Sequence, residues 1–146
     1  MESVLLSAHV VAGILFVGPI AVSTSLFPRY AAVVDDPERG SPAVAGALCR
    51  ITRVYGALAL AVPIIGFILA FVQGRVTEVW IIVAMVLTVI AGGLLAAQIA
   101  PRQREALDSP VDGAALRRLG MLAGIFNLLW TVVVVLMVVR PGSHLA

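Results

Sequence analysis

No charged residue occurs in four stretches of this chain, and each stretch is more than twenty residues long. A helix rises about 1.5 Å per residue, so about twenty residues cover the roughly 30 Å hydrocarbon core of a bilayer. Each stretch can therefore cross a membrane once as a helix. The sequence predicts an all-α membrane protein, a bundle of four transmembrane helices. The predicted spans are about 4–27, 54–73, 79–100 and 119–139.

The composition supports this class. Hydrophobic residues make up 61% of the 146 residues, charged residues only 12%, and the mean hydropathy is +1.08. These values lie beyond those of soluble domains. The connections between the stretches are short, so residues 1–146 are predicted to form one integral membrane domain without room for a soluble catalytic module. The expected partner is the lipid bilayer. Nucleic acid is not expected as a partner, because the excess of basic residues is attributed to the orientation of the chain in the membrane, as described next.

The arginines predict the orientation in the membrane. Eight of the ten flank the first and third connections, namely Arg29, Arg39, Arg50, Arg53, Arg102, Arg104, Arg117 and Arg118. Arginine-rich short loops stay in the cytoplasm, so both termini are predicted to lie outside. The chain has no lysine and is rich in Ala, Val and Gly, which suggests a bacterial genome rich in G and C. The predicted location is the bacterial cytoplasmic (inner) membrane, crossed several times.

Two Ser-Pro pairs in the arginine-rich connections predict helix starts. Ser41 precedes Pro42, and Ser109 precedes Pro110. A serine side chain can cap a helix, and proline at the first helical position loses no hydrogen bond. The similar pairs suggest either a duplicated hairpin or a common way to begin a cytoplasmic helix. Pro63, in the middle of the second span, should bend that helix.

Small residues predict where helices pack. Gly120 and Gly124 form a GxxxG pattern in the last span, and Gly92 and Gly93 begin a small stripe in the third. Such residues let helix backbones approach closely in lipid. The neighbouring helix belongs either to the same chain, which a four-helix bundle favours, or to a second copy or another membrane subunit. Val133, in a run of β-branched residues, is expected to face lipid.

Polar residues within the spans are few. Asn127 lies near mid-membrane in the last span and is a candidate for helix packing. His9 has three interpretations: a structural residue bonded to a neighbouring helix through a group such as Thr131, a ligand for haem, or a pH-sensitive switch. No carboxylate or lysine lies within a span, which disfavours a proton-driven transporter. No catalytic residue and no metal site are predicted.

Parts of the chain resemble a known family. The run 7–13 followed by Gly18 looks like the first helix of several bacterial four-span families. The arginine-led second helix, the run 126–129 and the ending 136–142 look more particular. Together they are similar to the predicted integral membrane proteins of domain-of-unknown-function family 2269, whose relatives would be copper-resistance-D-like membrane proteins and the membrane-bound protoporphyrinogen oxidase.

The resemblance implies a four-helix fold more firmly than an activity. If the likeness to the oxidase holds, His9 of this chain matches the haem-ligand position on the first helix of that family. That enzyme relies on a membrane lysine, and this chain has none. The copper-resistance proteins use additional His and Met residues that this chain lacks. What the resemblance supplies is therefore a fold.

These features favour a small integral membrane protein without its own catalytic activity, acting as an accessory or scaffold component of an inner-membrane complex. The alternative is a b-type haem or porphyrin-binding redox protein that uses His9. A further alternative is a small transporter of a neutral or lipid-like substrate, which would not need a charge in the membrane.

Overall fold

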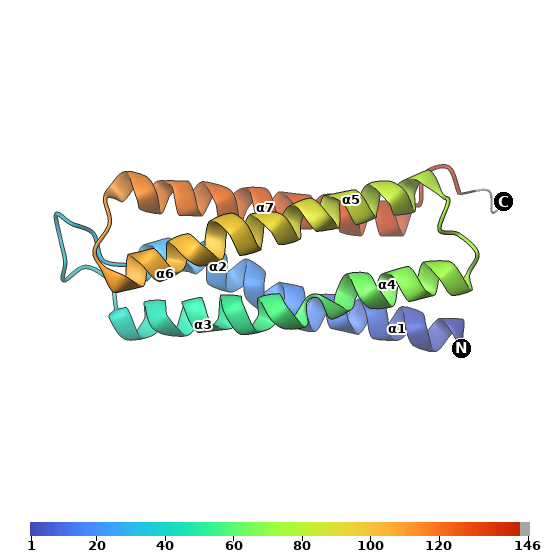
Figure 1. Cartoon of the computed structure of the whole chain (residues 1–146), viewed down its shortest axis with the longest axis horizontal. Helices are drawn as coiled ribbons and strands as arrows, with labels where there is room; N and C mark the ends of the chain where they lie inside the picture. Colours follow the sequence, from blue (N-terminus) through green and yellow to red (C-terminus); the bar gives the residue numbers. More distant parts are fainter. Residues whose placement is uncertain (144–146) are drawn as a thin grey trace.

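The computed structural model describes residues 1–143 and shows four antiparallel helical rods (Figure 1). Each rod except the last is interrupted. The elements are α1 (Glu2–Ala12), the π-helical turn η1 (Gly13–Val17) and α2 (Gly18–Tyr30); α3 (Pro42–Leu58) and α4 (Ala61–Val72); α5 (Val79–Leu94), the π-helical turn η2 (Leu95–Ile99) and α6 (Ala100–Asp108); and α7 (Gly113–Val139). The predicted four-helix bundle is confirmed.

The surface of the bundle is apolar where a membrane would surround it. All four rods are long and apolar enough to span a bilayer, with mean hydropathies of 2.2 to 2.6 in their most apolar parts. Only 17–22% of the residues in those parts are buried inside the bundle. A soluble protein does not expose so large a continuous apolar surface. The fold is therefore that of a multi-pass membrane protein.

Prolines explain the interruptions. Pro63 has no N–H to give to Ala59, and the chain turns at residues 59–60 while Val62 N–H bonds the Ala59 carbonyl at 3.0 Å. This confirms the predicted bend. Pro19 and Pro101 each lie in the first turn of the α-helix that follows a π-helical turn. A proline ring clashes with the carbonyl four residues earlier, and a π-helical turn relieves that clash.

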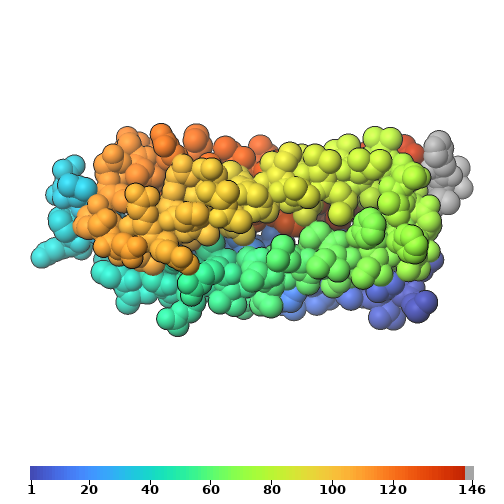
Figure 2. Space-filling view, viewed as in Figure 1, coloured from blue at the N-terminus to red at the C-terminus, as the bar shows by residue number. Residues whose placement is uncertain are grey.

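The helices pack differently at the two ends. We call the end that carries the 31–41 and 109–112 connections the arginine-rich end, because the eight clustered arginines lie there. At the opposite end α1 pairs with α4 and α5 pairs with α7 (Figure 1). The space-filling view shows a hollow between α4 and α5 (Figure 2). The four rods therefore pack less tightly against one another at the opposite end.

The main hydrophobic core lies in the half of the bundle nearer the arginine-rich end. Its members are Ile20, Phe27, Ala31, Val33, Ala45, Leu48, Ala91, Leu95, Ile99, Ala106, Leu116, Leu119 and Phe126. None of them comes from α1 or α4, both of which the structure describes in full. Because several lie beyond the apolar stretches, the core continues past the membrane into the arginine-rich end.

The two arginine-rich connections are joined by the backbone. Val34 N–H bonds the Val111 carbonyl at 3.0 Å. Ser41 caps α3 as predicted, accepting from Val44 N–H at 3.4 Å. The predicted start of the last helix at Ser109 is wrong, because Val111 is held in extended backbone by this pairing and Asp112 supplies the cap instead, accepting from Ala115 N–H at 2.6 Å.

A cluster around Trp80 closes the opposite end. The Trp80 indole N–H donates to the Glu78 carboxylate, which also pairs with Arg75 at 3.5 Å. The Arg140 guanidinium lies 5.8 Å from the centre of the Trp80 ring. These contacts connect the beginning of α5 with the end of α7, where an amphipathic aromatic ring is expected at a membrane surface.

Membrane orientation is tested by labelling. In a Cys49→Ser background, we expect Asp35→Cys and Ser109→Cys to resist a membrane-impermeant maleimide in intact cells, because the arginine bias predicts that both connections lie in the cytoplasm. Thr77→Cys, in the connection at the opposite end, serves as the accessible control. Labelling of both Asp35→Cys and Ser109→Cys from outside, with Thr77→Cys protected, would invert the topology.

Candidate functional site

His9 lies between α1 and α4. Its side chain is 7% exposed, and Nδ1 lies 3.0 Å from the backbone carbonyl oxygen of Val62. A carbonyl can only accept, so Nδ1 carries the proton and donates. The ring also lies against Gly66, where an added Cβ would come within 2.7 Å of Cε1 and 3.2 Å of Nδ1. Only glycine leaves room for this imidazole.

This geometry agrees with the structural interpretation of His9. The prediction that His9 bonds Thr131 is wrong. The Thr131 hydroxyl donates instead to the Asn127 carbonyl of its own helix at 2.8 Å. The His9 ring instead contacts the backbone of α4, the neighbour of α1 within the first hairpin. The other histidine, His144, lies outside the described residues.

A second polar contact joins the same hairpin closer to the arginine-rich end. The hydroxyls of Ser23 on α2 and Thr52 on α3 lie 2.9 Å apart, and both side chains are 1% exposed. Thr24 is equally buried and donates to the Ile20 carbonyl at 2.8 Å. The Ser23–Thr52 pair is therefore an interhelical contact in an apolar medium, whereas Thr24 bonds the backbone of its own helix.

Asn127 connects α7 with α2. Its amide Nδ2 donates to the Ser25 hydroxyl at 3.0 Å, while its Oδ1 is buried without a partner in the described part of the chain. The indole N–H of Trp130, one turn further along α7, is likewise buried and unpaired among residues 1–143. Asn127 therefore lies in a helix contact, and two of the polar atoms at this level lack partners.

Gln103 was not singled out by the sequence, yet it is among the most buried polar residues. It lies on α6 with 1% exposure, and neither Nε2 nor Oε1 has a hydrogen-bond partner in residues 1–143. Its neighbours at helical spacing, Ile99 and Ala106, belong to the core. The signal that could have identified Gln103 is its position on the same helix face as two core residues. Using this signal requires knowledge of which face of α6 is buried.

The glycine faces point away from the chain's own helices. All four glycines are exposed, and an added Cβ would meet no atom of residues 1–143 within 4 Å at Gly92, Gly93, Gly120 or Gly124. The favoured prediction, that these glycines pack against helices of the same chain, is therefore wrong. Packing against another chain stays a prediction.

The inward face of α7 is a different one. Its buried residues recur at spacings of three, four and seven, namely Leu116, Leu119, Ala123, Phe126 and Val133. Val133, expected to face lipid, is fully buried. The glycines sit one position beyond this stripe, which rotates them about 100° out of the interface.

Two pockets lie at the arginine-rich end. One, of about 200 Å³, lies between α6 and α7 and is lined by Arg102, Glu105 and Arg118 among others. The other, of about 450 Å³, lies between α3 and α6. Within residues 1–143 no three His, Cys, Asp or Glu side chains come close enough to hold a metal ion. Charged groups thus gather beside the membrane, outside the transmembrane part.

Fold and site together define the class: a four-helix, multi-pass membrane protein in which His9, the Ser23–Thr52 pair and Asn127 make hydrogen bonds between helices. Comparison of the chain with protein-family models, with curated proteins and with solved structures finds no match.

Proposed function

We propose that the protein is an accessory or scaffold component of a complex in the bacterial cytoplasmic membrane, without catalytic activity of its own. The observation that carries the proposal is the outward position of Gly120 and Gly124, where no atom of residues 1–143 lies within 4 Å of an added Cβ. Close backbone approach at small residues is a main source of helix association in lipid. An uncovered GxxxG face therefore suits a transmembrane helix of another subunit or of a second copy.

The haem alternative ranks lower because of the surroundings of His9. The imidazole Nε2 could bind iron while Nδ1–H remains bonded to Val62. The ring, however, is 7% exposed and lies against Gly66. These surroundings do not fit a haem unless α1 and α4 separate. A Soret band that disappears in His9→Ala would reverse this ranking. The transporter of a neutral or lipid-like substrate stays a further alternative.

Photocrosslinking tests the proposal. With a photoreactive amino acid at Leu128, one turn beyond Gly124 and 64% exposed, we expect a discrete crosslinked product in membranes, containing either a second copy or another membrane protein. Gly120→Leu should weaken that product by blocking close approach. It should leave the melting temperature nearly unchanged, since Gly120 is exposed and an added Cβ there meets no atom of residues 1–143 within 4 Å.

Val134 provides the matched control for this experiment. It is on the same helix and 55% exposed, but no glycine lies beside it. The same photoreactive residue at Val134 should crosslink mainly to lipid. Equal products from Leu128 and Val134, or a product at Leu128 that Gly120→Leu leaves unchanged, would contradict the proposal.

A further inference from the structure

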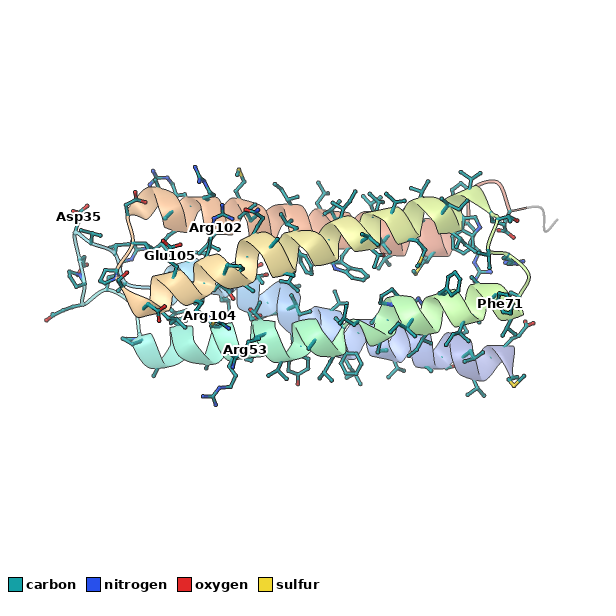
Figure 3. The ribbon with its side chains drawn as sticks, in the orientation of Figure 1. Asp35, Arg53, Phe71, Arg102, Arg104 and Glu105 are labelled. Carbon is teal, nitrogen blue, oxygen red and sulfur yellow. The ribbon has the colours of Figure 1, made fainter. Side chains whose placement is uncertain are left out.

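The larger pocket at the arginine-rich end contains two cations at the membrane boundary. Arg53 on α3 and Arg104 on α6 line the same pocket of about 450 Å³, and Figure 3 labels both. Arg53 directly precedes the charge-free stretch 54–74, and Arg104 lies three residues after Pro101, the end of the stretch 79–101. Both guanidinium groups therefore lie near the level of lipid phosphates. Basic pockets between transmembrane helices are known sites for lipid headgroups.

The membrane side of this pocket is lined by small apolar side chains. Ala96 and Ala100 line it, and Gly92 precedes them on the same helix at the same spacing of four residues. Gly92 and Ala96 are exposed, and an added Cβ on Gly92 would meet no atom. This stripe of small side chains leads from the hydrocarbon region to Arg104, and its shape and polarity suit an acyl chain.

The water side of the pocket is acidic. Asp108 and Glu105 line it, and Asp108 lies one turn, about 6 Å, beyond Arg104 on α6. Within residues 1–143 the one ion pair is Arg75–Glu78, at the other end of the molecule. The arginines and carboxylates of the pocket therefore do not neutralise one another directly. The order from membrane to water is apolar surface, two cations and then Asp108, with Glu105 at nearly the depth of Arg104.

We propose that this pocket binds a phospholipid with an ethanolamine headgroup. The acyl chain lies along Gly92, Ala96 and Ala100, the phosphate accepts hydrogen bonds from Arg53 and Arg104, and the ammonium donates to the carboxylates. Guanidinium groups are suited to phosphate oxygens, and an ammonium bonded to a carboxylate is a charge-assisted pair. A choline headgroup has no N–H to donate, and a glycerol headgroup has no charge for the carboxylates.

Native mass spectrometry of the purified full-length protein tests the assignment, with dioleoyl phosphatidylethanolamine, phosphatidylcholine and phosphatidylglycerol as probes. We expect about tenfold tighter binding of the ethanolamine lipid than of the choline lipid, the effect of one charge-assisted hydrogen bond. Arg104→Gln should weaken binding of all three. Asp108→Asn should remove only the preference for ethanolamine over choline.

Control variants show whether the effects are specific to this pocket, and a soluble competitor shows whether the acyl chain contributes to binding. Arg117→Gln, at the same end but outside both pockets, should bind like the parent protein. Ala96→Leu should weaken binding of all three lipids without changing a charge, because it fills the stripe. Equal affinity for the ethanolamine and choline lipids would overturn the proposal. Competition by soluble phosphoethanolamine as effective as the lipid itself would overturn the role of the stripe.

Cys49 gives a second readout in membranes. It is the single cysteine of the chain and lines the same pocket. In nanodiscs of phosphatidylcholine, adding phosphatidylethanolamine should slow maleimide labelling of Cys49, and Arg104→Gln should abolish that protection. Labelling that proceeds at one rate in both lipid compositions would contradict occupancy of the pocket.

Discussion

Gly66→Ala is expected to lower the free energy of unfolding by about 1–3 kcal/mol, the usual effect of overpacking a filled interface. The added methyl group would lie 2.7 Å from Cε1 of His9, closer than such contacts occur. His9 cannot move away without losing its bond to the Val62 carbonyl. The sign is informative, because alanine normally stabilises a helix relative to glycine by about 1 kcal/mol. Unfolding in detergent or by steric trapping in bicelles measures the change.

A double-mutant cycle identifies the cause. His9→Ala alone should lose the interhelical bond, and Gly66→Ala should become harmless in that background, giving a coupling energy of about 1 kcal/mol or more. Gly93→Ala is the matched control, because its methyl group meets no atom within 4 Å. If Gly66→Ala and Gly93→Ala behaved alike, the close contact between His9 and α4 would be refuted.

Gln103→Met is expected to stabilise the protein by about 1–3 kcal/mol. The amide is buried without a hydrogen-bond partner in the described chain, and methionine keeps its length and shape without its polar atoms. Gln103→Glu should instead destabilise strongly, since a charge would replace a neutral group in the same place. Both effects are measured as shifts in the unfolding free energy.

Gln98→Met is the control for this pair. Gln98 lies on the same rod but is exposed, with its side chain bonded to Arg102, so its replacement should change stability by less than about 0.5 kcal/mol. A loss of stability in Gln103→Met, with Gln98→Met neutral, would show that the buried amide makes stabilising hydrogen bonds and would disprove the expectation.

The sequence was sufficient to predict the four helical rods. It was not sufficient to predict which face of each rod points into the bundle. Absence of charge over twenty residues marks a span, whichever way the helix faces. In lipid, however, both the inward and the outward faces are apolar, so hydrophobic periodicity does not separate them. This is why Val133 was placed outward and Gly124 inward, the reverse of what the structure shows. The same ambiguity hid Gln103.

Local chemistry predicted the helix ends with mixed success. The Ser41 cap and the Pro63 bend follow from groups within a few residues of each feature, and both occur. The start of α7 depends on a distant segment, because pairing with the 31–41 connection keeps Val111 extended. The partner of His9 likewise depends on how two rods meet. Long-range contacts of this kind leave no trace in a single sequence.

The interruptions of the first two rods have a joint mechanical consequence. The contacts His9–Val62 and Ser23–Thr52 lie on either side of both, so η1 and residues 59–60 lie opposite each other at one depth. Beyond that depth, α1 and α4 hold each other and contribute nothing to the main core. We therefore expect α1 and α4 to move together if this half of the bundle rearranges, with the backbone bending at the two interruptions. Such a movement would change the width of the hollow between α4 and α5, while the core at the arginine-rich end, to which neither helix contributes, would keep its contacts.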